Sequence, residues 1–334
     1  MSHTTNPDTF RVPNEYAQEY LSVNAGLTLE PATITTYDCQ LTEFITFLNA
    51  RETTVISASF TDIIEYIEDC VRRGNRKSTL SGKLTVIAEL YRYIRLRTDA
   101  GEDLNLDPLR FREINLNRYN TPPSIEREAL SREEIRRLFD AFDSYRNRLM
   151  AIVGVETGLR NSDIRNLQMQ YVESDRIHVH DPKNSKPYDV PISDELAFEL
   201  DTWFKHHRPG FSAASDSDYV FPSHGGERLT QNSSLNQIVK EAAERAGIQD
   251  VIARSAISES QQKVLRTEKQ YCEWSRVTVH TLRHSYITLL SKSGVALPYR
   301  QLVANHKNAA TTQGYSHDGN DVFDHIRGNY DPPR

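Results

Sequence analysis

Six polar residues in the second half of the chain are of the types needed to cut and rejoin a phosphodiester. In chain order they are Arg160, Lys183, His280, Arg283, His306 and Tyr315. Transesterification passes through a phosphorane-like dianion, and two guanidinium groups can neutralise and orient its equatorial oxygens through paired hydrogen bonds. A phenol with a pKa of about 10 attacks better beside a base, and the poor 5′-oxygen leaving group needs a proton donor such as lysine. The ordered set therefore predicts metal-free transesterification with a tyrosine nucleophile.

Each of these residues has an ordinary structural explanation when it is taken alone. Arg160 could be a surface ion-pair residue, and Tyr315 could pack in a core. His280 and Arg283 are three residues apart and so share a helix face, where capping or packing is the common role. His280 and His284 could also form a metal pair, but HExxH is absent and Arg283 between them would repel a cation. Only the set as a whole indicates the chemistry.

Two motifs that contain the arginines resemble those of the tyrosine recombinases, the lambda-integrase and Xer-like site-specific recombinases. That family shows TGLR followed by a helix with an acidic residue, and this chain has TGLR at 157–160 and then Asp163. The family also shows HxLRH, which is HTLRH at 280–284 in this chain.

Two further motifs extend the resemblance over roughly residues 20–318. The last motifs of the family, in chain order, are LGH, TT and a tyrosine. This chain has ANH at 304–306, TT at 311–312 and then Tyr315, nine residues after His306. Asn305 replaces the usual glycine, and it is the next most tolerant residue for a left-handed turn. The family's KGNK-type hairpin before VPL is matched by KNSK at 183–186 before VPI at 190–192.

The resemblance implies a role for each residue of the set. Arg160 and Arg283 would clamp the scissile phosphate, and Tyr315 would form a 3′-phosphotyrosyl link. Lys183, rather than Lys186, would protonate the leaving oxygen. His280 would assist proton transfer at the tyrosine and His306 would hydrogen-bond the phosphate. Asp163 would support the site, and no cofactor, metal or ATP would be needed.

The elements that must position these residues are mostly helical. Apolar residues step by three and four from Ile34 to Leu48, from Phe60 to Val71 and from Leu80 to Ile94. RIHVH at 176–180 and YDVPI at 188–192 alternate around a turn and predict a hairpin. The predicted fold is mainly α with a small β-sheet (α+β): a helical core-binding bundle followed by a tyrosine-recombinase catalytic domain.

The expected division of the chain follows its composition. Residues 1–14 read as a disordered tail, 15–108 as the helical DNA-binding domain, 109–127 as a Pro-containing linker and 128–334 as the catalytic domain with its tail. A capping box begins at Ser131 with Glu134. The long polar stretch at 248–279 has no predicted role.

The charge balance alone does not indicate a nucleic-acid partner, because the net charge is −6 and the pI about 6.0. Basic residues are concentrated between 72 and 97, where only Glu89 opposes them. A solvated helix face is one explanation, and binding of the DNA backbone is the other. The residues predicted to bind DNA are Arg72, Arg73, Arg76, Lys77 and Lys83.

The expected partners are double-stranded DNA and further copies of the chain, four protomers on two sites, and the resemblance leaves open whether accessory DNA-binding proteins take part. The tail stripe of Val322, Phe323 and Ile326 is expected to pack against a neighbouring protomer, or else on its own domain. No apolar run approaches the ~20 residues of a membrane span. Three scattered cysteines and a polar start favour a cytoplasmic protein.

Three other functions compete with site-specific recombination. A type IB topoisomerase shares the chemistry but acts on any duplex without assembling a synapse. A non-catalytic DNA-binding regulator could keep the fold alone. A metallohydrolase would need a site built from His178, His180, His280 and His284, and chelator-insensitive cleavage would exclude it.

Overall fold

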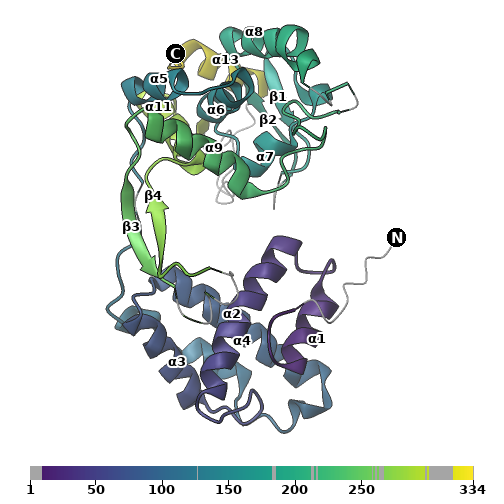
Figure 1. The fold of residues 1–334 in the computed structure, drawn as a ribbon, viewed down its shortest axis with the longest axis vertical. Coiled ribbons are helices and arrows are strands. Elements are labelled where there is room, and N and C mark those ends of the chain that lie inside the picture. Colours follow the sequence, from purple (N-terminus) through teal and green to yellow (C-terminus); the bar gives the residue numbers. More distant parts are fainter. Residues whose placement is uncertain are drawn as a thin grey trace. The chain divides into compact units, whose positions relative to one another are not determined.

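Most of the chain is helical in the computed structural model, which describes residues 10–125, 127–182, 186–211, 214–215, 217–257, 259, 262, 267–297, 299–300 and 319–333 (Figure 1). Contacts divide the chain into two compact units. The N-terminal unit is Met1–Ile125 with Ala253–Trp274, and the C-terminal unit is Glu126–Ile252 with Ser275–Arg334. The predicted fold class, helical with small sheets, is confirmed.

The N-terminal unit is built on helices that begin where the sequence supplies a cap. They are α1 (Glu15–Asn24), α2 (Pro31–Asn49), α3 (Phe60–Arg72) and α4 (Lys77–Arg97). Asn14 accepts a hydrogen bond from the Ala17 amide, and Ser59 with Asp62 forms a capping box at α3. The apolar faces predicted from the spacing meet in one core, where Leu41, Ile63 and Ile87 are fully buried.

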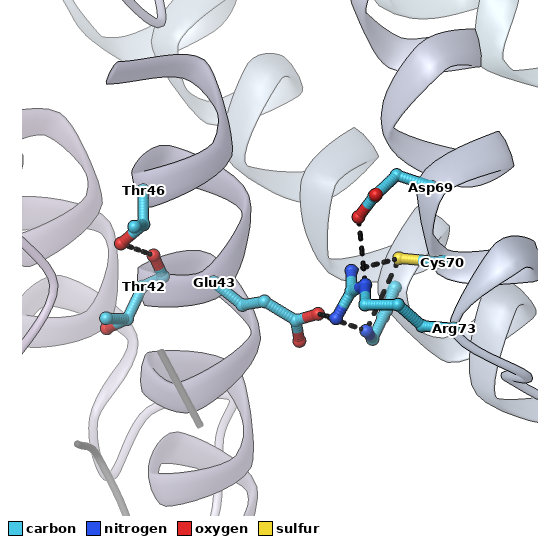
Figure 2. Close-up of polar contacts among 7 residues, drawn as sticks. Thr42, Glu43, Thr46, Asp69, Cys70 and Arg73 are labelled. Atoms are coloured by element: carbon cyan, nitrogen blue, oxygen red, sulfur yellow. Dashed lines mark hydrogen bonds and ion pairs between the residues drawn. The ribbon is translucent and has the colours of Figure 1, made fainter. Parts of the chain in front are cut away.

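A balanced group of charges lies between three of these helices; Glu43 and Lys83 are buried, whereas Arg73 and Asp69 are partly exposed. Glu43 of α2 accepts from Arg73 at 2.6 Å and from Lys83 of α4 at 2.7 Å. Arg73 also pairs with Asp69 at 2.8 Å, and its guanidinium donates to Cys70 Sγ at 3.1 Å (Figure 2). Burial raises the pKa of the Cys70 thiol, so the thiol stays neutral and two carboxylates balance two cations.

The C-terminal unit places a small sheet among helices. The helices are α5 (Arg132–Asp140), α6 (Tyr145–Thr157), α7 (Asn161–Asn166), α8 (Asp194–Thr202), α9 (Asn232–Arg245), α11 (Val279–Lys292) and α13 (Gly319–Asn329). The predicted capping box of Ser131 and Glu134 starts α5. α6 and α11 pack closely, since a Cβ on Gly154 of α6 would lie 3.3 Å from Leu282 Cδ1.

The predicted hairpin is present as two short antiparallel strands, β1 (Arg176–Val179) and β2 (Tyr188–Pro191). Ile177 pairs with Val190, and both side chains are fully buried in the core of the unit. The stretch 248–279 holds a second two-stranded sheet that the sequence did not indicate, β3 (Val251–Ala256) and β4 (Tyr271–Ser275).

The expectation that the tail packs against a neighbouring protomer is wrong in this structure. Phe323 and Ile326 of α13 are buried in a cluster with Tyr286, Leu290 and Val295 of their own unit. The described end of the chain is also held by an ion pair between Arg132 and Asp331 at 3.1 Å. Phe323 and Ile326 therefore pack in a core of their own chain.

Neutralising Glu43 should destabilise the N-terminal unit. Glu43→Gln keeps the side-chain shape but leaves the buried Lys83 ammonium beside a neutral amide, a change that costs about 3–5 kcal/mol. Hydrogen exchange of the α3 and α4 amides would report the opening of this unit.

The matched control is Glu65→Gln. Glu65 pairs with Arg51 at 3.7 Å in an exposed position, so the loss should stay below about 1 kcal/mol. Equal protection in the two variants would contradict a stabilising role for the buried charges.

Candidate active site

The TGLR motif forms a tight turn that ends α6. Gly158 adopts the left-handed conformation, with φ of +63°. A Cβ at this position would overlap the ring of Tyr286, so both the backbone conformation and the available space require glycine. The Thr157 hydroxyl donates to the Val153 carbonyl at 2.5 Å and accepts from the Leu159 amide at 3.3 Å, which fixes the last turn.

The HTLRH motif forms the first turns of α11 and reaches the same place. Thr281 and Leu282 are buried, whereas His280 and His284 are exposed on the other side of the helix. The buried guanidinium of Arg283 donates through NH1 to the Gly158 carbonyl. This hydrogen bond brings together two motifs that lie far apart in the sequence.

Arg160 leaves the turn as the residue that precedes α7. Its carbonyl accepts from the Ile164 amide at 3.0 Å, and its guanidinium lies 3.9 Å from Asp163 Oδ2. The Arg160 side chain is 31% exposed, whereas that of Asp163 is 1% exposed. The carboxylate is therefore beneath the surface and the guanidinium is within reach of a ligand.

Asp163 is held by two hydroxyl groups as well as by charge. The Ser162 hydroxyl donates to it at 3.1 Å and the Tyr188 hydroxyl at 3.4 Å. Burial raises the pKa of Asp163, while the Ser162 hydrogen bond and the Arg160 charge act in the opposite direction. Burial, followed by the negative charge of Asp163, raises the pKa of Tyr188 to about 12, so this phenol stays protonated as a donor.

The two guanidinium groups form a site suited to an anion. Burial lowers the pKa of Arg283, and the positive charge of Arg160 lowers it further. A guanidinium nevertheless remains protonated, so two cations face one buried carboxylate. A phosphate oxygen placed between them would relieve this repulsion, and the planar donor groups suit its geometry.

His280 faces positive charge at the start of α11. Partial loss of water around its ring lowers the pKa of His280, and Arg127, Arg283 and His284 lower it further. The imidazole is therefore mostly neutral at pH 7 and can accept a proton.

Three predicted site residues lie outside the described residues: Lys183, His306 and Tyr315. The structure thus brings together Arg160 and Arg283, with His280 next to Arg283. It also adds two residues that the sequence did not indicate, Tyr188 and Tyr286. Tyr188 could have been found, because alternation places it on the same face as the buried Val190. Nothing in the sequence indicated that Tyr286 packs under Gly158.

The predicted DNA-binding residues separate into two groups. Arg72 and Lys77 are exposed, and Arg76 donates to the Pro123 carbonyl and to Ser255 Oγ, each at 3.0 Å. Arg73 and Lys83 instead pair with the buried Glu43. The prediction for Lys83 is wrong, because an ammonium that is 1% exposed cannot reach a phosphate.

The alternative metal site has no geometric support in the described part of the chain. There, no three side chains of His, Cys, Asp or Glu gather closely enough to hold an ion. His178, one of the four histidines considered, pairs with Asp189 at 2.5 Å.

None of the helices in the described ranges is both long and apolar enough to cross a bilayer.

Alanine at Gly158 should disrupt the paired arginines. The substitution adds backbone strain of about 1–2 kcal/mol and an overlap with the Tyr286 ring, so the melting temperature should fall clearly. The matched control is Gly247→Ala, because Gly247 also has a positive φ, of +64°, but no atom lies within 4 Å of its added Cβ. Equal melting temperatures for the two variants, measured by calorimetry, would show that the Tyr286 contact does not constrain the turn.

Curated relatives of this chain are tyrosine recombinases. Tyrosine recombinase XerD of Pasteurella multocida is 22% identical over 313 residues, which cover 91% of this chain and 93% of that protein. Tyrosine recombinase XerA of Thermococcus kodakarensis is 29% identical over 204 residues, which cover 58% of this chain and 61% of that protein.

Solved structures of lambda integrase share the fold. A dimer bound to a COC′ core site superposes with a TM-score of 0.63 at 14% identity, covering 91% of this chain and 95% of that one. A tetramer bound to a Holliday junction gives 0.60 at 14% identity, covering 88% and 77%.

Two family models match the sequence directly. The N-terminal SAM-like domain of phage integrases matches residues 16–98, and the phage integrase family matches residues 128–321. The second range contains the whole predicted set from Arg160 to Tyr315. The chain belongs to the phage integrase family, and so is a tyrosine recombinase.

Proposed function

We propose that this recombinase cleaves and rejoins duplex DNA at specific sites, with Tyr315 as its nucleophile. The observation that supports this most directly is the pair of guanidinium groups joined at the Gly158 turn. Arg283 is fixed by the Gly158 carbonyl and Arg160 lies beside the buried Asp163. Such a pair suits the charge that develops on a phosphate in transesterification.

The reaction exchanges one phosphoester bond for another, so it needs no external energy source. The Tyr315 oxygen attacks the scissile phosphorus, the bond from phosphorus to the 5′ oxygen breaks, and a 3′-phosphotyrosine remains. His280, which is neutral, accepts the phenolic proton, and Lys183 gives a proton to the leaving oxygen. His306 donates a hydrogen bond to the phosphate. Attack by another 5′-hydroxyl reverses these steps and restores the phosphodiester.

The partners follow from the same chemistry. Recombination exchanges four strands, so four protomers would assemble on two DNA sites, and a tetramer of lambda integrase has been solved bound to a Holliday junction. The helical domain expected at 15–108 would bind the DNA backbone through Arg72, Arg76 and Lys77, joined by the linker at 109–127 to the catalytic domain at 128–334. The protein would act in the cytoplasm.

Removing the Tyr315 hydroxyl should abolish covalent attachment to DNA. Tyr315→Phe should still bind a nicked suicide duplex carrying candidate sites, such as the sequences that flank the gene, but form no protease-resistant adduct. The control is Tyr330→Phe, because the Tyr330 hydroxyl donates to the Val155 carbonyl at 3.2 Å within its own unit. Tyr330→Phe should form the adduct, and an adduct in Tyr315→Phe would refute the assignment.

Lysine should replace Arg283 poorly. Arg283→Lys keeps the charge but loses the planar pair of donors that can bind both the Gly158 carbonyl and a phosphate, so cleavage should slow by roughly 100-fold. The rate is measured in single turnover with saturating enzyme. Arg276→Lys is the control, since Arg276 pairs with Glu134 at 2.7 Å outside the anion site. A near-normal rate in Arg283→Lys would contradict the clamp.

A further inference from the structure

The inward face of the β1–β2 hairpin carries a phenol that the reaction described above does not use. Tyr188 lies two residues before Val190 on β2, so both side chains point to the same face of the hairpin. Val190 is fully buried, whereas Tyr188 is half-buried and packs against the core of the C-terminal unit. Apolar contacts therefore hold the ring, and the hydroxyl at its far end is available for a hydrogen bond.

The Tyr188 hydroxyl reaches the carboxylate that lies beside the paired arginines. It donates to Asp163 Oδ2 at 3.4 Å. The same oxygen lies 3.9 Å from NH1 of Arg160. The other oxygen, Oδ1, accepts a hydrogen bond from the Ser162 hydroxyl at 3.1 Å. Each carboxylate oxygen thus has a hydroxyl donor, and Oδ2 faces both a phenol and a guanidinium.

Asp163 depends on its neighbours to stay ionised. Its side chain is only 1% exposed, so water has almost no access to it, and burial raises the pKa of Asp163. The Ser162 hydrogen bond and the positive charges of Arg160 and Arg283 act in the opposite direction. Tyr188 adds a donor from β2, and a hydrogen bond donated to the charged form favours ionisation.

Asp163 and a bound phosphate would compete for the donors of Arg160. The distance of 3.9 Å from NH1 to Oδ2 is longer than a hydrogen bond, so this contact orients the guanidinium through charge. Because two hydroxyl groups supply hydrogen bonds to the carboxylate, Arg160 can donate to a phosphate while Asp163 stays ionised. Burial and the negative charge of Asp163 raise the pKa of Tyr188 to about 12, so the phenol keeps its proton at neutral pH.

We propose that Tyr188 is a positioning residue for Arg160. Its hydroxyl holds the Asp163 carboxylate in place as an anion, and the carboxylate holds the Arg160 guanidinium where it meets the scissile phosphate. Tyr188 acts through Asp163 and forms no bond with the reacting atoms. The inference rests on the proposed function, because it assumes that Arg160 and Arg283 bind the phosphate.

The test is the pH dependence of cleavage by Tyr188→Phe. The substitution removes one oxygen and keeps the ring, so folding and duplex binding should be retained. Single-turnover cleavage at neutral pH should slow by roughly 10-fold, since misplacing a catalytic group by about 1 Å can cost up to about 100-fold in rate. Without the phenol the pKa of Asp163 rises further, and the carboxylate is lost as the pH falls through that pKa. The deficit relative to the wild type should therefore grow as the pH is lowered.

Tyr145→Phe is the matched control. Tyr145 begins α6, at the opposite end of that helix from the Gly158 turn, and its hydroxyl donates to the Glu199 carboxylate. Glu199 also pairs with Arg148 at 3.5 Å, so a phenol, a carboxylate and a guanidinium meet there as well. Tyr145→Phe should keep the wild-type rate at every pH.

Two results for Tyr188→Phe would overturn the proposal. The first is cleavage at the wild-type rate. The second is a deficit that is the same at every pH, because a purely structural loss does not follow the ionisation of Asp163.

Asp163→Asn tests whether Tyr188 acts through the carboxylate. In this background no carboxylate can titrate, so adding Tyr188→Phe should cost little more and should not change the pH profile. A further loss as large as that in the wild-type background would show that the phenol acts elsewhere, which would refute the positioning role.

Arg160→Ala separates failure of this inference from failure of the proposed function. If Arg160→Ala cleaves at the wild-type rate, the arginines do not clamp the phosphate, and the proposed mechanism fails together with the inference. If Arg160→Ala is slow and Tyr188→Phe is not, the clamp stands and only the role of Tyr188 is refuted.

Discussion

The Gly158 carbonyl at the end of α6 accepts a hydrogen bond from Arg283 on α11, and the geometry of the anion site depends on this contact. A helix normally leaves its last carbonyls without partners, and here one of them receives a guanidinium. The left-handed turn that exposes this carbonyl is possible because glycine stands at 158 and the Tyr286 ring fills the space beside it. Arg160 follows two residues later, so a single turn places both guanidinium groups.

The local charge at the anion site is opposite in sign to the net charge of the whole chain. The protein carries a net charge of −6, which would repel DNA, yet the site joins two guanidinium groups to one buried carboxylate. In the N-terminal unit, by contrast, Glu43 and Asp69 offset the charges of Arg73 and Lys83.

The sequence predicted the hairpin and most of the helices because their apolar spacing is regular, and it failed where one side chain departed from its pattern. Lys83 lies between Leu80, Leu84 and Ile87 on the buried face of α4, so helical spacing assigns it to the core. The prediction that Lys83 binds DNA together with the neighbouring arginines did not take this helical spacing into account. The tail was misjudged for another reason: its apolar stripe needs a partner, and spacing alone cannot show that Tyr286 and Leu290 provide it.

Side chains alternate along β1 and β2, so the two faces of the hairpin make different contacts. On the inward face, Ile177 and Val190 are buried, and the Tyr188 hydroxyl donates to Asp163. This face therefore connects the hairpin to the anion site. On the outward face, His178 lies opposite Asp189, and this polar contact favours the observed pairing of the two strands. An apolar face alone stabilises a strand without selecting strongly among registers that differ by two residues. The polar face adds that selection.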